Sequence, residues 1–293
     1  MADQAGGLRN LMGKGRLTTE PAAQGKSCRV ISITSGKGGV GKTNLAVNLS
    51  LVLAQQGLRV VLFDADLGLA NVDVLMGIYA KYNLQDFLYE RKTLREIMVK
   101  GPHNLQIIPG GSGIYQLANL NRRQQERFIR ELLEFEKEVD VILIDTSAGL
   151  SNNVLRFISA AHELIVVTTP EPTSITDAYS IIKVVSNYKL HSKIGLVVNR
   201  VKSEREAREV VDKIDRVAKR YLQIKLDYLG EILDDLQVVQ AVKTQKPFVL
   251  SCPSCKAAES VRRLALSLTE ASPKEEAKRG LSGFLNKMIK LLS

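Results

Sequence analysis

The segment from Gly36 to Thr43 carries the strongest chemical signal in the chain. It fits the phosphate-binding pattern G-x-x-x-x-G-K followed by serine or threonine, in which Lys42 reaches the β and γ phosphates and Thr43 places its hydroxyl on Mg²⁺. Lys37 is an extra lysine that such a loop does not require, and it indicates a site completed by another subunit. The predicted nucleotide-binding residues of the loop are Gly36, Lys37, Gly38, Gly39, Val40, Gly41, Lys42 and Thr43.

The segments on both sides of this loop have the character that phosphate binding requires. The β-branched, apolar run 29–34 predicts a buried strand, and 44–54 has helical periodicity that ends before Gly57. A helix that begins directly after the loop adds positive potential at the phosphates. A glycine-rich turn without function would not need both flanks, so we expect a nucleotide site.

Three acidic residues follow apolar, strand-like runs. Asp64 and Asp66 come after 60–63, and Asp145 comes after 139–144. Ligands of open parallel sheets lie at the carboxyl ends of the strands, so these acids can converge on the loop. We expect Asp66 to orient the attacking water and Asp145 to lie on the Mg²⁺ side, acting through a water, while Asp64 could support either role. Each acid alone is equally typical of a strand that simply ends.

Four segments resemble the MinD/ParA class of P-loop ATPases, from about Cys28 to about Leu268. These are the deviant phosphate loop 35–43, the catalytic-aspartate segment 64–73, the second acidic motif 145–150 and the switch loop 168–173. The resemblance implies an ATP-closed sandwich dimer in which Lys37 reaches the partner's nucleotide. It also implies that Asp66, Lys37 and Lys42 act in hydrolysis. Asn199, after the strand-like run 194–198, falls where the class contacts adenine.

The first nine residues resemble the D-Q-A-x-x-L-R element of FlhG proteins, also called YlxH or FleN, which regulate flagellar number and placement. This resemblance implies that the element activates the GTPase FlhF, with Gln4 approaching the nucleotide of that partner. It further implies flagellar switch proteins or a flagellar transcription regulator as partners. From composition alone the segment is typical of a disordered tail. The predicted partner-binding residues are Asp3, Gln4, Ala5, Leu8 and Arg9.

The last thirteen residues have apolar positions spaced along one helical face, with Lys287 and Lys290 elsewhere on the helix. A helix of this kind beyond a charged, Pro-containing stretch predicts a membrane-surface anchor for anionic lipid. Two copies on an ATP-closed dimer would bind lipid more tightly than one copy would. Packing of the helix on the core is the alternative. The predicted membrane-facing residues are Leu281, Phe284, Leu285, Met288, Ile289 and Leu292.

Alternation of strand-like and helix-like segments predicts an α/β fold with a doubly wound, mostly parallel sheet of the P-loop NTPase type. We expect a flexible N-terminal segment 1–27, an ATPase domain 28–268, a linker 269–280 and an amphipathic helix 281–293 in a chain of 293 residues. No apolar run approaches the roughly 20 residues that span a bilayer, and the N-terminus lacks a signal-peptide core. These features predict a cytoplasmic protein, peripheral on the inner face of the cell membrane.

The net charge of +10 suits anionic lipid, nucleic acid or plain solubility. Without aromatic interleaving or a DNA-binding motif, solvated helix faces explain it best. Rival functions are a MinD-type division-site regulator, a ParA-like DNA-binding partition ATPase and an Mrp-like iron–sulfur carrier. The last would use Cys252 and Cys255, a C-x-x-C pair that is equally a redox pair or a loop turning on Pro253. The scattered histidines receive no role.

Overall fold

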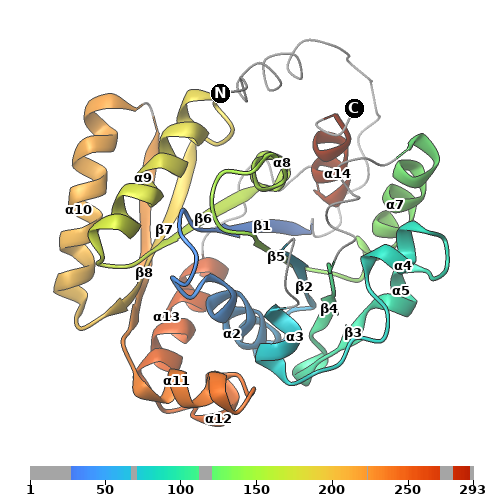
Figure 1. Ribbon diagram of the computed structural model, residues 1–293, viewed down its shortest axis with the longest axis horizontal. Helices are drawn as coiled ribbons and strands as arrows, with labels where there is room; N and C mark the ends of the chain where they lie inside the picture. The colour runs from blue at the N-terminus through green and yellow to red at the C-terminus, as the bar shows by residue number, and fades with distance from the viewer. Residues whose placement is uncertain (1–27, 67–70, 112–120, 223, 271–279, 291–293) are drawn as a thin grey trace.

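The computed structural model describes residues 28–66, 71–111, 121–222, 224–270 and 280–290. Its centre is a sheet of eight strands, all parallel except that β3 runs antiparallel to β4 at one edge. In their order across the sheet (Figure 1) the strands are β3 (Val99–Lys100), β4 (Gln106–Ile108), β2 (Val60–Ala65), β5 (Val141–Thr146), β1 (Arg29–Thr34), β6 (Glu163–Thr168), β7 (Lys193–Val201) and β8 (Lys225–Leu233).

Helices cover both faces of this sheet, as the doubly wound prediction requires. One face is covered by α2 (Lys42–Gln55), α3 (Asn71–Met76), α11 (Leu236–Lys243), α12 (Phe248–Ser251) and α13 (Lys256–Glu270). The other face is covered by α4 (Leu84–Leu88), α5 (Leu94–Ile97), α7 (Arg122–Phe135), α8 (Asn152–Ala160), α9 (Pro172–Asn187), α10 (Glu204–Tyr221) and α14 (Gly280–Lys290). A short 3₁₀ helix, η1 (Pro102–Asn104), joins β3 to β4. The predicted fold class is therefore confirmed.

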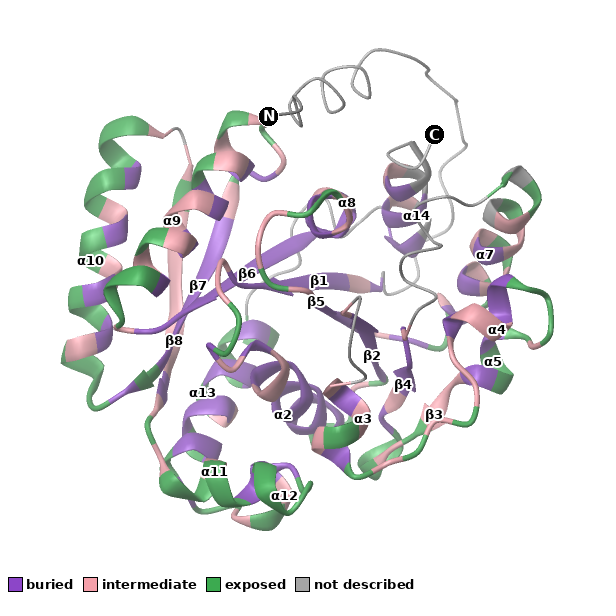
Figure 2. Ribbon diagram, viewed as in Figure 1, coloured by how far each residue is buried: buried purple, intermediate pink, exposed green. Residues whose placement is uncertain are grey.

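The central strands are apolar on both sides because each side faces a layer of helices. In β1, Ile31 and Ile33 join the core around α2, while Val30 points into the core on the opposite face. In β5, Leu143 and Ile144 divide between the two faces in the same way. This period of two explains why the strands read as continuous apolar runs rather than alternating ones. Figure 2 shows the strands β1, β5 and β6 buried through most of their length.

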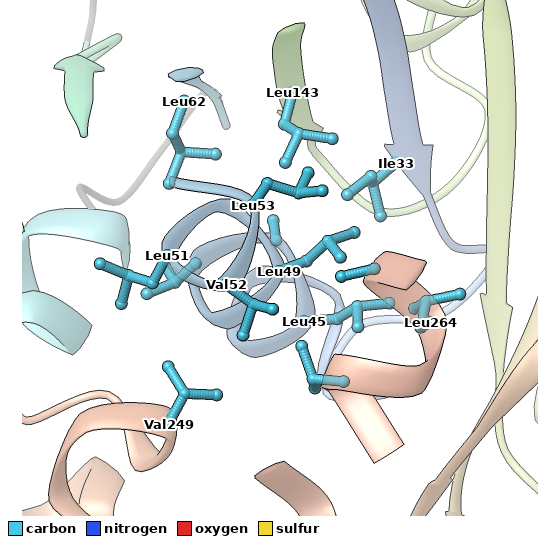
Figure 3. Packing of buried hydrophobic residues seen from close by; sticks show 14 of the residues in the cluster. Ile33, Leu45, Leu49, Leu51, Val52, Leu53, Leu62, Leu143, Val249 and Leu264 are labelled. Carbon is cyan, nitrogen blue, oxygen red and sulfur yellow. The ribbon is translucent and has the colours of Figure 1, made fainter. Parts of the chain in front are cut away.

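Helix α2 is buried around most of its circumference, which fixes the phosphate loop that precedes it. Leu45, Leu49 and Leu53 are each at most 3% exposed, and Figure 3 shows α2 surrounded by side chains from the sheet and from neighbouring helices. Two polar side chains inside this surface are satisfied locally. Asn48 donates to the Asn44 carbonyl and accepts the Val249 N–H of α12, and Ser50 Oγ donates to the carbonyl four residues earlier.

Helix α14 packs on the body of the protein against α7, α8 and β1 (Figure 1). The side chains of Leu281, Phe284, Leu285 and Met288 are buried in the same core cluster as Cys28. The face expected to meet a membrane is thus covered in this state. The predicted linker is also shorter at both ends than expected, because α13 continues to Glu270 and α14 begins at Gly280. Leu292 and the side chain of Ile289 lie outside the described residues.

No helix within the described ranges is long and apolar enough to cross a membrane. The N-terminal segment 1–27, with the predicted partner-binding residues Asp3, Gln4, Ala5, Leu8 and Arg9, lies outside those ranges.

Candidate nucleotide site

The loop from Gly36 to Thr43 joins the end of β1 to the first turn of α2. Gly39 and Gly41 adopt left-handed backbone angles, with φ of 78° and 88°, which side chains other than glycine rarely accept. Gly36 has a different reason to be glycine. A Cβ at Gly36 would lie 2.3 Å from backbone atoms of Asp177, so the loop presses directly on α9. The geometry of the loop therefore depends on glycine at three positions.

Lys42 forms a buried ion pair with Asp145. Its Nζ lies 2.6 Å from Asp145 Oδ1, and the two side chains are 7% and 0% exposed. Burial raises the pKa of Asp145, and the Lys42 ammonium opposes that rise. The second carboxylate oxygen, Asp145 Oδ2, has no hydrogen-bond partner among the described residues. The Lys42 ammonium is thus paired with the Asp145 carboxylate in a position from which the lysine would reach the phosphates of a nucleotide.

Asp64 stands beside Asp145 because β2 and β5 are neighbours in register, with the two residues paired across the ladder. Its oxygens accept the backbone N–H groups of Asp66, at 3.2 Å, and Val72, at 3.4 Å. Burial, followed by the nearby Asp145 carboxylate, raises the pKa of Asp64 to about 7. Two buried carboxyl groups side by side favour a bound cation or a bound proton at this position.

Asp66 lies past the end of β2 and is held on both oxygens. Ser147 Oγ donates to Oδ1 at 2.9 Å, and Asn71 Nδ2 donates to Oδ2 at 3.2 Å. The sequence did not predict either partner. What could have indicated them is their position, since Ser147 follows Asp145 by two residues and Asn71 is the first residue of α3. The Ser147 hydrogen bond joins the segments that follow β2 and β5 through the predicted catalytic carboxylate.

Lys37 extends to the switch loop of its own chain. Its Nζ lies 2.8 Å from Glu171 Oε2 and 3.1 Å from Thr173 Oγ1. The side chains of Lys37 and Glu171 are 40% and 58% exposed, and the Lys37 ammonium lowers the pKa of Glu171. An ion pair this exposed is easily exchanged for another partner. The predicted switch loop therefore contacts the extra lysine within one chain.

Asn199 lies in β7, and its Nδ2 donates to the Val40 carbonyl at 2.6 Å, which ties the sheet to the phosphate loop. A cavity of about 650 Å³ opens beside it, between the loop and α11. The size is within the range of small-molecule sites, and the position beside the phosphate loop suits a nucleotide base. Helix α11 forms one wall of this cavity, which was not expected from the sequence because α11 lies far along the chain from the loop. The residues that line the cavity include Gly41, Asn199, Asp234, Leu236, Val239 and Phe248.

The chain resembles known proteins over most of its length. Residues 26–269 match the family model described as ParA, NUBPL iron-transfer P-loop NTPase. The antiactivator FleN of Pseudomonas aeruginosa is 40% identical over 237 residues, which are 81% of this chain and 85% of FleN. The flagellum site-determining protein YlxH of Helicobacter pylori is 34% identical, with 90% of each chain covered.

Solved structures agree with this assignment. MinD of Pyrococcus horikoshii in complex with Mg-ADP has a TM-score of 0.68 at 28% identity, covering 83% of this chain and 96% of that chain. MinD in the MinC:MinD complex of Aquifex aeolicus has a TM-score of 0.67, also at 28% identity, covering 83% and 96%. The glycine loop, its lysines and the strand-end acids occupy one edge of the same fold. The chain belongs to the MinD/ParA family of P-loop ATPases, among the relatives of the flagellar proteins FleN and YlxH.

Proposed function

We propose that the protein is an ATP-driven switch that dimerises with ATP, binds the membrane through α14 and regulates flagellar number and placement. The observation that carries the proposal is the extra lysine of the phosphate loop, Lys37, held on the switch loop by an exposed ion pair in a chain related to FleN and YlxH. The apolar face of α14 packs on α7 and α8 in this state, so membrane binding requires its release. Helix α8 begins at Asn152, directly after the loop that follows β5; Asp145 lies at the end of β5 and Ser147 in this loop. A change at the nucleotide therefore has a short route to the groove that holds α14.

The phosphate loop supports ATP as the nucleotide. Lys42 would leave Asp145 for the β and γ phosphates, and the cavity beside Asn199 would take the adenine. The donors present fit Mg²⁺, which prefers oxygen ligands: the Thr43 hydroxyl, the unpartnered Asp145 Oδ2 and the Asp64 carboxylate. When bound, Mg²⁺ supplies positive charge against the charge that develops on the phosphates. Asp66, held by two donors, orients the attacking water.

Dimerisation uses Lys37. Its ion pair with Glu171 is exposed, so the lysine can exchange that carboxylate for the phosphates of the partner's ATP. The exchange would free the switch loop at the start of α9, which also presses on Gly36. Hydrolysis removes the γ phosphate, so Lys37 loses the negative charge that holds it across the interface.

Membrane binding and partners complete the proposal. The apolar face of α14 would leave its groove and enter the surface of an anionic bilayer, while Lys287 faces lipid headgroups. This places the ATP-bound protein on the inner face of the cell membrane and the ADP-bound protein in the cytoplasm. The relation to FleN and YlxH supports flagellar regulation as the task. Segment 1–27 would engage FlhF, and flagellar switch proteins or a transcription regulator are the further partners.

Liposome co-sedimentation tests this proposal. Purified protein is mixed with anionic liposomes and ATP, ADP or no nucleotide, and a chain that ends at Glu270 is the matched control. We expect sedimentation of the full chain with ATP alone, and none of the shorter chain. Binding that ignores the nucleotide would contradict the switch. Binding to DNA in place of lipid would favour a partition function.

A further inference from the structure

Cys252 and Cys255 bracket a tight turn between α12 and α13. The Cys255 N–H donates to the Cys252 carbonyl at 3.1 Å, and both cysteines are free. A turn closed in this way holds its first and last Cα atoms within about 7 Å of each other. Cα atoms this close can be bridged by a disulfide.

The two thiols differ in access and surroundings. Cys252 is partly exposed, whereas Cys255 is 8% exposed and belongs to the core cluster around α2. Cys255 directly precedes α13, and its carbonyl accepts the Glu259 N–H of the first turn at 3.1 Å. Burial, assisted by the Asp235 carboxylate, raises the pKa of Cys255. A reagent from solution therefore meets Cys252 first, and Cys255 is placed to react second.

The turn is connected to the cavity that we assign to the base. Upstream, the Cys252 N–H donates to the carbonyl of Phe248, a residue that lines the cavity, at 2.9 Å. Downstream, Asp235 accepts the Ala257 N–H at 3.4 Å and caps α11 through the Gln237 N–H at 2.9 Å. The turn thus touches two elements of the cavity wall, one on each side of the cysteine pair.

We infer that Cys252 and Cys255 form a thiol–disulfide exchange site, and that closing their disulfide alters the α11–α12 wall of the nucleotide cavity. The oxidant is a low-molecular-weight disulfide. The Cys252 thiolate attacks one sulfur of this disulfide, and the other sulfur leaves as a thiolate with the electron pair of the broken bond. Cys255 then loses its proton and attacks Cys252 Sγ, which expels the second thiolate. The pair gives up two electrons and two protons, and the reagent becomes two thiols.

A closed single-chain metal site is not the better assignment. Structural metal sites need about four ligands, and the described residues hold no group of three or more His, Cys, Asp or Glu side chains suited to a metal. Closing the disulfide, in contrast, needs no further ligand. It brings the two sulfurs to about 2 Å from each other. That movement pulls on the ends of α12 and α13 at the cavity wall.

The thiol chemistry is tested on the full chain with glutathione disulfide and intact-mass analysis. We expect a product lighter by two hydrogen atoms, without retained glutathione and reversible by dithiothreitol. Cys255→Ala is expected to keep one glutathione on Cys252, whereas Cys252→Ala stays unmodified at Cys255. Fully buried Cys28 is the internal control. A stable adduct in the native sequence, equal adducts in both variants or iron or zinc retained by the pair would overturn the assignment.

The coupling to the cavity is tested by ADP affinity in the reduced and oxidised protein. We expect the dissociation constant to differ by about fivefold or more, while Cys252→Ser shows no response to the oxidant. Equal affinities would overturn the coupling. This half of the inference rests on the proposed nucleotide site, and the exchange chemistry does not. If the reduced protein itself fails to bind ADP, the proposed function fails, while the mass analysis still decides the exchange site.

Discussion

At the scale of single residues, the buried pair of Lys42 and Asp145 links phosphate binding to stability. Removing the ammonium with Lys42→Met leaves a fully buried carboxylate without its partner. We expect the free energy of unfolding of the nucleotide-free protein to fall by about 3–5 kcal/mol in urea titrations. The double variant Lys42→Met, Asp145→Asn has no charge left to compensate and should recover most of the loss. An equal loss in both variants would show that the pair contributes through packing alone.

Asp64 predicts a pH dependence with a definite sign. Its pKa rises from an ordinary 3.8 to about 7 in the folded protein. Between these values the folded state binds a proton that the unfolded state has released, so stability falls as pH rises from 4 to 7. Unfolding of the nucleotide-free protein, followed by denaturant from pH 4 to pH 8, should show this decline. Asp64→Asn removes the titrating group and should flatten that part of the profile. A decline of the same slope in the variant would assign it to other groups.

At the scale of elements, the docking of α14 depends on a cap supplied by another segment. Glu136, just after α7, accepts the Leu281 N–H on Oε1 at 2.8 Å. Glu136→Ala removes this acceptor and leaves α14 unchanged, at a cost to docking of about 1 kcal/mol. Both Glu136→Ala and Glu136→Gln remove the carboxylate charge that raises the pKa of Cys28, but only Glu136→Gln keeps an acceptor oxygen for the Leu281 N–H. We therefore expect Cys28 to be modified by a thiol reagent about fivefold faster in Glu136→Ala than in Glu136→Gln, because Cys28 shares the cluster that α14 covers. Equal rates in the two variants would show that the cap does not hold α14 in place.

The sequence predicted these elements unevenly, for physical reasons. Buried strands such as 29–34 were predictable because helices on both faces require continuous apolar runs. The ends of the strands were less predictable from the sequence. Strand β2 continues through Asp64 and β7 continues through Asn199, because both residues still pair with the neighbouring strand. Periodicity gave the apolar face of α14 but could not say what covers it. That choice depends on the surface formed by α7, α8 and β1, whose residues are distant in the chain.

Within the site, features made by adjacent residues were predictable and features made by residues distant in the chain were not. The phosphate loop was clear because its glycines and lysines are adjacent in sequence. The neighbours that hold its chemistry were not, because Ser147 and Asn71 meet Asp66 only after folding. Helix α11 likewise comes beside the phosphate loop, to form one wall of the cavity, only after folding. The predicted roles of Asp66, Asp145 and Asn199 remain predictions, to be tested with nucleotide bound.

At the scale of the whole molecule, Lys37 should decide whether ATP produces a dimer. Lys37→Ala removes the group that would cross the interface, and Lys42 remains for binding within one chain. We expect ATP-dependent dimerisation, measured by light scattering in an Asp66→Asn background, to be lost while ADP binding persists. Lys100→Ala changes an exposed lysine on the edge strand β3 and is the matched control. A stable ATP dimer without Lys37 would contradict the proposed interface.

The reactivity of Cys28 in each nucleotide state reports directly whether ATP releases α14. Burial, with the nearby Glu136 and Asp140 carboxylates, raises the pKa of the Cys28 thiol to about 12, so the docked state protects it twice. Cys252→Ser and Cys255→Ser leave it as the single thiol of the chain. With liposomes present, we expect slow modification with ADP, fast modification with ATP, and fast modification in every state for a chain ending at Glu270. Equally slow modification with ATP and ADP, in a protein that dimerises with ATP, would contradict the release of α14.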